Sequence, residues 1–350
     1  MLAAVYHGRE DLRVEERPVP AITENEVLVK VEAASICATD LRIWQGNHRK
    51  YGPGTVRIPG HELAGTVSEV GSGVHGFEAG QRVVIAPNIG CGACRECLRG
   101  QSNLCRNYDA FGITLDGAFA EYMRITAPAL EQGNVIALPQ GMNAAAAALV
   151  EPLACVLHGQ EAVRVGAGDV VVIMGAGPIG LMHLLLARHH GASRVFISDL
   201  VPGRLEKARA LGADLTVNLI EEDLVSVVTR QTDGGGADVV IVAAPSQPAQ
   251  EQAVCLAGVG GRISFFAGMP KQQPPIQLDA NAIHYRELVI TGSTGCSTTD
   301  CRRALALVVS GQVDLGPLVS HRFALRDTLA AFAAAADRSG LKVVLEPGAG

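Results

Sequence analysis

The spacing of apolar and polar residues changes character along the chain. Residues 25–36, NEVLVKVEAASI, read as a strand, and residues 58–87 read as strands that glycine turns interrupt. Short apolar runs bounded by glycine and proline are typical of antiparallel strands and their turns. The first ~150 residues therefore predict a β-barrel-like domain.

A second pattern begins near residue 163, where strands alternate with helices. Residues 169–174, DVVVIM, form an unbroken apolar run, as expected of a parallel strand buried on both faces. A helix over 179–191, a strand over 194–199 and a helix over 203–214 follow. Further strands are expected at 237–244, 261–268 and 287–293, and the tail from residue 298 alternates helix and short strand. The alternation predicts an α/β protein with a doubly wound parallel sheet.

Length and composition narrow the class of protein. A chain of 350 residues exceeds one ordinary core, so two domains are expected. The net charge of -6 provides no basic surface for nucleic acid. No apolar run reaches the length of a membrane span, and the N-terminal residues lack the apolar core of a signal peptide. We therefore expect a cytoplasmic protein without a nucleic-acid or membrane partner.

Cysteine spacing indicates a metal site. Four of the nine cysteines lie within fifteen residues, as Cys91, Cys94, Cys97 and Cys105. Disulfides rarely persist in the cytosol, whereas this spacing suits a loop around one tetrahedral zinc ion. The alternative is a cysteine-rich loop without metal. Four thiolates leave no open coordination position, so the predicted zinc is structural rather than catalytic.

A glycine motif follows the first buried strand of the alternating region. Gly175, Gly177 and Gly180 match the pattern in which glycines form a tight turn, admit a pyrophosphate and let helix pack on strand. Pro178 and Ile179 lie inside this loop, where the helix N-terminus favours an anion. The sequence therefore predicts a dinucleotide site.

The second strand of this region ends in an acidic residue that bears on cofactor choice. Asp199 can accept the ribose hydroxyls and repel a 2′-phosphate, which favours NAD over NADP. Arg204 follows on the next helix. It is either a surface charge or a cation that leaves NADP use open.

Other metal-competent residues are scattered through the first half of the chain. Cys37, His61, Glu62 and Glu151 each have an ordinary alternative role as a buried thiol, a turn residue or a helix-start charge. Taken together and in order, the segments resemble the zinc-dependent medium-chain alcohol dehydrogenase family, in particular its polyol and threonine dehydrogenase branches. The resemblance spans essentially the whole chain. It is carried by Cys37 to Asp40, Gly60 to Glu62 with Gly65, the four clustered cysteines, Glu151 with Pro152, and Gly175 to Gly180 with Asp199.

The resemblance implies a fold and a domain arrangement. A GroES-like β-barrel catalytic domain would comprise residues 1–152 and 293–350, with a structural zinc lobe at 88–107. A Rossmann domain over 153–292 would bind NAD. The family also implies a homotetramer or homodimer, and two zinc ions per subunit, one catalytic and one structural.

The resemblance further implies the catalytic residues. Cys37, His61 and a carboxylate, Glu62 or Glu151, would hold the catalytic zinc. Three anionic ligands would overcompensate Zn²⁺, so one carboxylate is expected to bind weakly. Asp40 would fix the tautomer of His61. Thr39 would accept the hydrogen bond of the substrate hydroxyl.

The implied reaction transfers a hydride from a secondary alcohol to NAD and gives a ketone. The expected small-molecule substrate is a polyol, cyclitol or sugar derivative. The alternatives are a threonine-type amino-alcohol dehydrogenase, a zinc-free quinone reductase and a catalytically silent NAD-binding protein. Arg42 replaces the relay histidine of several family members, and Gly295 and Cys296 replace the polyol-holding Arg-Tyr pair. Because of these departures, the resemblance does not identify the alcohol substrate.

Overall fold

The computed structural model describes residues 1–269, 273–337 and 340–348. The chain forms two compact units, Met1–Ala154 with Gly295–Gly350, and Cys155–Thr294. Among the described residues, no helix is both long and apolar enough to cross a membrane.

The first unit is built mainly from strands. Its core is a seven-stranded sheet in the order β16-β17-β3-β4-β5-β9, with β8 paired to β3, and two further two-stranded sheets join β1 to β2 and β6 to β7. The strands are β1 Leu2–Gly8, β2 Asp11–Glu16, β3 Val27–Ser35, β4 Glu62–Val70, β5 Arg82–Ile85, β6 Asn88–Ile89, β7 Asp109–Ala110, β8 Tyr122–Ile125, β9 Val135–Ala137, β16 Val319–Ala324 and β17 Lys342–Glu346.

Short helices connect and cover these strands. They are α1 Ala38–Trp44, α2 Arg95–Leu98, η1 Ser102–Leu104, α3 Ala127–Glu131, α4 Ala144–Ala148, α11 Thr298–Val309, η2 Gly316–Leu318, η3 Leu325–Asp327 and α12 Thr328–Ala336. Helix α4 packs on β3 and β4, and α12 packs on β16 and β17. The long helix α5, Val150–Ala162, leads from the first unit into the second.

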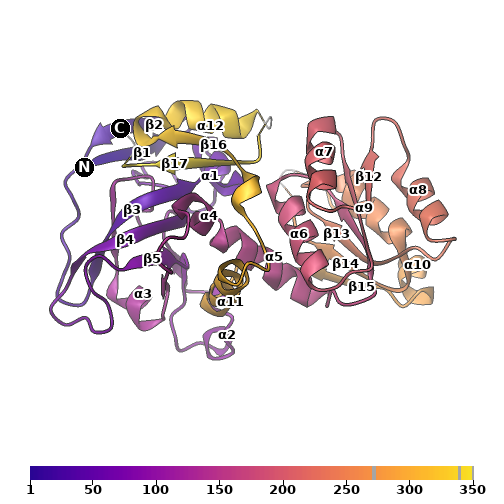
Figure 1. The fold of residues 1–350 in the computed structure, drawn as a ribbon, viewed down its shortest axis with the longest axis horizontal. Coiled ribbons are helices and arrows are strands. Elements are labelled where there is room, and N and C mark those ends of the chain that lie inside the picture. Colours follow the sequence, from indigo (N-terminus) through magenta and orange to yellow (C-terminus); the bar gives the residue numbers. More distant parts are fainter. Residues whose placement is uncertain (270–272, 338–339, 349–350) are drawn as a thin grey trace. The chain divides into compact units, whose positions relative to one another are not determined.

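The C-terminal strands complete the sheet that the N-terminal strands begin. Strand β17 pairs antiparallel with β3, so that Leu345 lies opposite Ala34. Figure 1 shows the yellow strands β16 and β17 beside the violet strands β3 and β4, although hundreds of residues separate them in the sequence. The first unit therefore requires both ends of the chain.

The second unit is a parallel sheet with helices between its strands. The strand order is β12-β11-β10-β13-β14-β15, and every pairing is parallel. This order reverses direction after β10, as in doubly wound dinucleotide-binding sheets. The elements are β10 Val170–Met174, α6 Pro178–His189, β11 Arg194–Asp199, α7 Pro202–Ala210, β12 Leu215–Asn218, α8 Leu224–Gln231, β13 Ala237–Val242, α9 Gln247–Leu256, β14 Ala257–Phe265, α10 Ala280–Tyr285 and β15 Val289–Gly292.

The predicted apolar runs lie in the buried strands of this sheet. Val171, Val172 and Ile173 of β10 are fully buried, because strands flank β10 on both sides and helix α6 packs against it. The helix expected over 203–214 is shorter and ends at Ala210, since Leu211 caps it and Gly212 adopts a φ of +96°.

The close turn from β10 into α6 gives a test of local packing. A Cβ built on Gly180 would lie 1.8 Å from the Gly175 carbonyl oxygen, so Gly180→Ala must displace backbone. We expect a loss of about 2 kcal/mol or more in the free energy of unfolding, with weakened dinucleotide binding.

Gly203→Ala is the matched control, because a Cβ on that helical glycine would meet no atom within 4 Å. It should leave the stability unchanged or raise it by up to about 1 kcal/mol. Urea unfolding and titration with NAD measure both effects. Equal stability of the two variants would contradict the packing argument.

Candidate active site and metal centres

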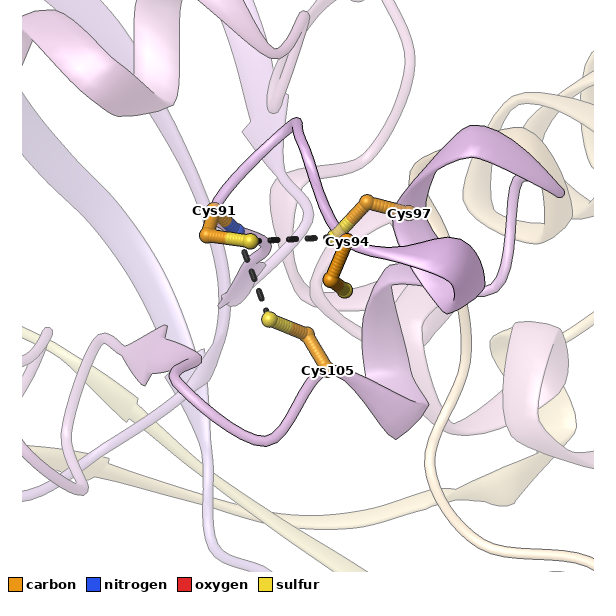
Figure 2. A group of neighbouring side chains, drawn as sticks. All are labelled: Cys91, Cys94, Cys97 and Cys105. Carbon is orange, nitrogen blue, oxygen red and sulfur yellow. Dashed lines mark hydrogen bonds between the residues drawn. The ribbon is translucent and has the colours of Figure 1, made fainter.

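The four clustered cysteines converge in the lobe that follows β6. Cys91, Cys94 and Cys97 lie around the short helix α2, and Cys105 follows η1. Their sulfur atoms all lie within 4.8 Å of one another, and Cys91 Sγ is 4.0 Å from Cys97 Sγ. Figure 2 shows the four thiols pointing into one space. A tetrahedral zinc with bonds of about 2.3 Å needs sulfur atoms at such separations, so the residues fit the ion.

The backbone of this lobe favours the thiolate form. Backbone N–H groups of Ala93 and Cys94 donate to Cys91 and lower its thiol pKa to about 6. Backbone donors also favour the thiolates of Cys94 and Cys97, but burial and the neighbouring thiols outweigh them, raising the pKa of Cys94 to about 12 and that of Cys97 above its usual value. The backbone N–H of Cys91 also donates to Cys105 Sγ, at 3.4 Å. Zinc binds thiolates rather than thiols, so these donors prepare the ligands.

A second group of metal-competent residues forms at the pairing of β3 with β4. Ser35 of β3 lies opposite Glu62 of β4, so Cys37, just beyond β3, meets His61 and Glu62. The ligand atoms of Cys37, His61 and Glu62 all lie within 4.8 Å of one another. Gly60 supports this turn with a φ of +97°, and a Cβ there would lie 2.6 Å from the Phe119 ring.

Asp40 links two of these residues. One of its oxygens accepts the backbone N–H of Cys37 at 2.9 Å, and the other lies 3.4 Å from His61 Nδ1. This leaves Nε2 of His61 for a metal. Burial lowers the pKa of His61, but the negative charges of Asp40 and Cys37 outweigh it and raise that pKa well above its usual value. The pocket therefore favours positive charge.

Glu62 has one oxygen paired and one free. Lys342 Nζ lies 2.5 Å from Glu62 Oε2, and both side chains are buried. Glu62 Oε1 is buried and has no hydrogen-bond partner within the described chain. Such an atom is costly unless something binds it, so its presence beside Cys37 and His61 fits a metal ligand.

The sequence did not lead us to Lys342. Burial lowers its pKa, but Glu62 and then Cys37 raise it above the usual lysine value, so the ammonium stays charged. The sequence does contain an indication of its role: Lys342 begins the apolar run KVVLE, which predicts a buried strand. A lysine is rarely buried without a charged partner, so a partner could have been expected.

Glu151 lies outside the trio of Cys37, His61 and Glu62 but near it. It is the second residue of α5 and is only 9% exposed. The thiol of Cys296 donates to its Oε1 at 3.7 Å. Its charge also acts on Lys342, so the structure places Glu151 in the neighbourhood of the trio.

Thr39 and Arg42 lie on successive turns of α1. Arg42 Nη2 donates a hydrogen bond of 2.9 Å to Thr39 Oγ1. The guanidinium thus occupies one lone pair of the hydroxyl and places a fixed positive charge beside it.

The glycine loop has the geometry of a phosphate-binding turn. Gly175 has a φ of +111°, and a Cβ on Gly177 would meet only Arg204 Nη1, at 3.7 Å. Helix α6 begins at Pro178, followed by Ile179, with its N-terminus at the loop. The open space above Gly177 and the free N–H groups suit a pyrophosphate.

Asp199 ties the end of β11 to this loop. Its Oδ2 accepts the N–H of Ala176 at 2.7 Å, and its Oδ1 accepts the N–H of Val201 at 2.9 Å. These bonds hold the carboxylate beside the glycine turn, and each oxygen keeps a further lone pair.

Known proteins resemble the chain over its whole length. Family models described as "Alcohol dehydrogenase GroES-like domain" and "Zinc-binding dehydrogenase" match residues 23–140 and 178–310. A sorbitol dehydrogenase of Halalkalibacterium halodurans is 33% identical over 99% of this chain and 98% of its own. An L-threonine 3-dehydrogenase of Chelativorans sp. is 35% identical over 96% of each. A solved structure from Sinorhizobium meliloti 1021, provisionally described as a zinc-binding dehydrogenase and bound to NADP, has 32% identity and a TM-score of 0.92 over 99% of both chains.

The buried pair of Lys342 and Glu62 gives the second test. Lys342→Gln leaves the Glu62 carboxylate buried without its cation, so the metal-free protein should lose about 3–5 kcal/mol in the free energy of unfolding. Zinc supplies replacement charge, so the zinc-loaded variant should lose less.

Arg322→Gln is the matched control, since it breaks the Arg322–Glu346 ion pair on the same sheet, where the side chains are 45% and 27% exposed. That change should cost less than about 1 kcal/mol. Denaturant unfolding with and without zinc compares the variants. A similar loss for both, or no effect of zinc, would refute the proposed charge balance.

Proposed function

The chain belongs to the zinc-dependent medium-chain alcohol dehydrogenase family, and on that premise we propose that it oxidises a secondary alcohol to a ketone with NAD. The observation that carries the proposal is the trio of Cys37, His61 and Glu62, with a buried and unpartnered Glu62 oxygen. A catalytically silent protein has no use for so costly an arrangement.

Cys37, His61 and Glu62 would hold the catalytic zinc. When bound, zinc supplies Lewis acidity that lowers the pKa of a coordinated hydroxyl group. The Cys37 thiolate and the Glu62 carboxylate would balance its charge, and Lys342, ion-paired with Glu62, would draw electron density from that carboxylate. Glu62 is then the weaker of the two anionic ligands, which preserves the Lewis acidity. Glu151 would act on the substrate side rather than as a permanent ligand.

Arg42 takes over part of what a relay histidine does elsewhere. It cannot accept a proton near neutral pH, but its charge lies beside the Thr39 hydroxyl through the 2.9 Å hydrogen bond. Thr39 would accept the substrate hydroxyl's hydrogen bond, and Arg42 would stabilise negative charge that develops there. The proton would then leave through water.

The proposed substrate class rests on the relatives and on the carboxylates near the site. Sorbitol and threonine dehydrogenases both resemble the chain at about one third identity, with 33% and 35% for the two examples. Two carboxylates near the site suit a substrate with several hydroxyl groups, so we favour a polyol, cyclitol or sugar derivative. The threonine-type amino alcohol is the second candidate, because its dehydrogenases match over a similar share of the chain.

Several finer features complete the proposal. Asp199 favours NAD over NADP, although the similar Sinorhizobium structure holds NADP.

Each subunit would hold two zinc ions, the second at the four clustered cysteines. Strand β15 lies at one end of its sheet with Val289 half-exposed, which supports assembly into a homodimer or homotetramer. The spacing of Cys91, Cys94, Cys97 and Cys105, which suits a metal rather than disulfides, supports a reducing, cytoplasmic location.

Metal analysis and a substrate panel test the reaction. Cys37→Ala should lower zinc from about two ions per subunit to about one, and kcat/KM by at least about a hundredfold. Cys94→Ala should also remove one zinc but reduce stability more than the chemical step. Polyols, cyclitols and amino alcohols with NAD identify the substrate. Full activity of Cys37→Ala would exclude the proposed mechanism, and turnover of threonine alone would favour the second candidate.

Cofactor preference depends on Asp199. Asp199→Ser removes the negative charge, so kcat/KM with NAD should fall about 10- to 100-fold while the value with NADP rises. Asp223→Ser is the control, since Asp223 caps α8 through the N–H of Ser226 at 2.8 Å and takes no part in the glycine loop. Steady-state kinetics with both cofactors measure the ratio. An unchanged ratio in Asp199→Ser would remove this residue from cofactor selection.

A further inference from the structure

Two cysteines outside the proposed zinc sites touch each other in the core of the first unit. Cys296 and Cys301 are 1% and 2% exposed, and their sulfur atoms lie 3.6 Å apart. Neither belongs to the trio or to the four-cysteine lobe, although the Cys296 sulfur lies within 4.8 Å of a Glu151 carboxylate oxygen. The proposed hydride transfer does not use this pair of thiols.

The start of helix α11 holds the pair in contact. Ser297 is the N-cap, and it exchanges hydrogen bonds with Asp300 in a capping box. Cys296 therefore precedes the cap, and Cys301 occupies the fourth helical position. These two positions normally carry apolar side chains that pack together and fix the entry of the chain into the helix. Here thiols occupy both, so the helix cap itself keeps the sulfur atoms adjacent.

The pair also contacts a residue of the proposed active site. Cys296 Sγ donates to Glu151 Oε1 at 3.7 Å and lies 3.9 Å from the Glu151 carbonyl oxygen. On the other side, Cys301 faces the buried surface of α11 with Ala304 and Leu305. A chemical change at Cys296 is therefore transmitted directly to Glu151.

We infer that Cys296 and Cys301 are a redox-active dithiol that hydrogen peroxide converts to a disulfide, and that a dithiol reductant returns the disulfide to two thiols. One thiol is oxidised to a sulfenic acid with release of one water, and the second thiol displaces the hydroxyl group as another water. The peroxide O–O bond breaks, an S–S bond forms, and both thiol protons leave in the waters. The sulfur atoms must approach by about 1.6 Å to reach bonding distance.

Disulfide formation removes the thiol donor from Glu151. Cys296 Sγ has to move toward Cys301 and loses its proton, so the 3.7 Å contact with the carboxylate ends. Because both thiols are buried, at 1% and 2% exposure, an oxidant as small as hydrogen peroxide is the reagent to which the pair would respond. Reversible cysteine pairs of this kind occur in the cytosol as redox sensors, where permanent disulfides are rare.

Peptide mass analysis tests the chemistry independently of the enzyme's substrate. Trypsin releases residues 287–302 as one peptide that contains both cysteines and no internal lysine or arginine. The zinc-loaded protein is treated with hydrogen peroxide, denatured with iodoacetamide and digested. We expect this peptide to be lighter by two hydrogen atoms and to resist alkylation, and dithiothreitol should restore two alkylated cysteines. Retention of two free thiols, or loss of zinc before the disulfide forms, would overturn the inference.

Variants separate this pair from the other cysteines. In Cys301→Ser the disulfide cannot form, so activity should survive a peroxide treatment that lowers wild-type activity several-fold. Cys255→Ser, which removes an exposed cysteine in the second unit, should remain as sensitive as the wild type. Equal sensitivity of Cys301→Ser and wild type would show that the pair does not control activity. The peptide mass of the wild type decides the chemical step even where a variant folds poorly.

Discussion

The buried ion pair between Glu62 and Lys342 is the interaction on which the first unit depends. Several groups that can carry negative charge lie close to one another here, namely Cys37, Asp40, Glu62 and Glu151. Burying such a cluster costs free energy unless positive charge balances it. Lys342 and the proposed zinc supply the opposing charge from two directions. Because Lys342 begins β17, the same residue joins the C-terminal strand to the site and balances its charge. The pairing of β17 with β3 and the ion pair of Lys342 with Glu62 therefore favour the same position for β17.

The two proposed metal centres differ in how far apart their ligands lie in the sequence, and this difference relates to their proposed roles. The four clustered cysteines come from one loop, whose backbone also supplies N–H donors to Cys91. The trio of Cys37, His61 and Glu62 needs the register of β3 with β4, and Glu62 needs the C-terminal strand as well. A site assembled from distant segments can leave one coordination position open, whereas the compact loop fills all four.

Much of this arrangement could be predicted because it depends on local patterns. The apolar run of β10, the glycine spacing from Gly175 to Gly180 and the cysteine spacing each report a short-range constraint. Lys342 and Glu62 lie 280 residues apart in the sequence, and Cys296 and Glu151 lie 145 residues apart, so no local pattern encodes either contact. The bond from Arg42 to Thr39 is local, but it depends on a side-chain conformation that spacing alone does not determine. The identity of the alcohol depends on such contacts. The sequence therefore predicts the type of reaction but not the individual substrate.

The division of the first unit between the two ends of the chain has a consequence for biosynthesis. The second unit, Cys155–Thr294, is continuous, so it can fold as soon as its last strand has left the ribosome. The first unit cannot finish until β17 emerges, after the whole of the second unit. During that interval β3 lacks its C-terminal neighbour, and Glu62 lacks its lysine. β8 can pair with Val27 to Lys30 of β3, but Ala34 and Ser35 have no partner from β17 until then, and the Glu62 carboxylate has no counter-charge. The nascent first unit therefore exposes a short strand edge that could pair with other chains.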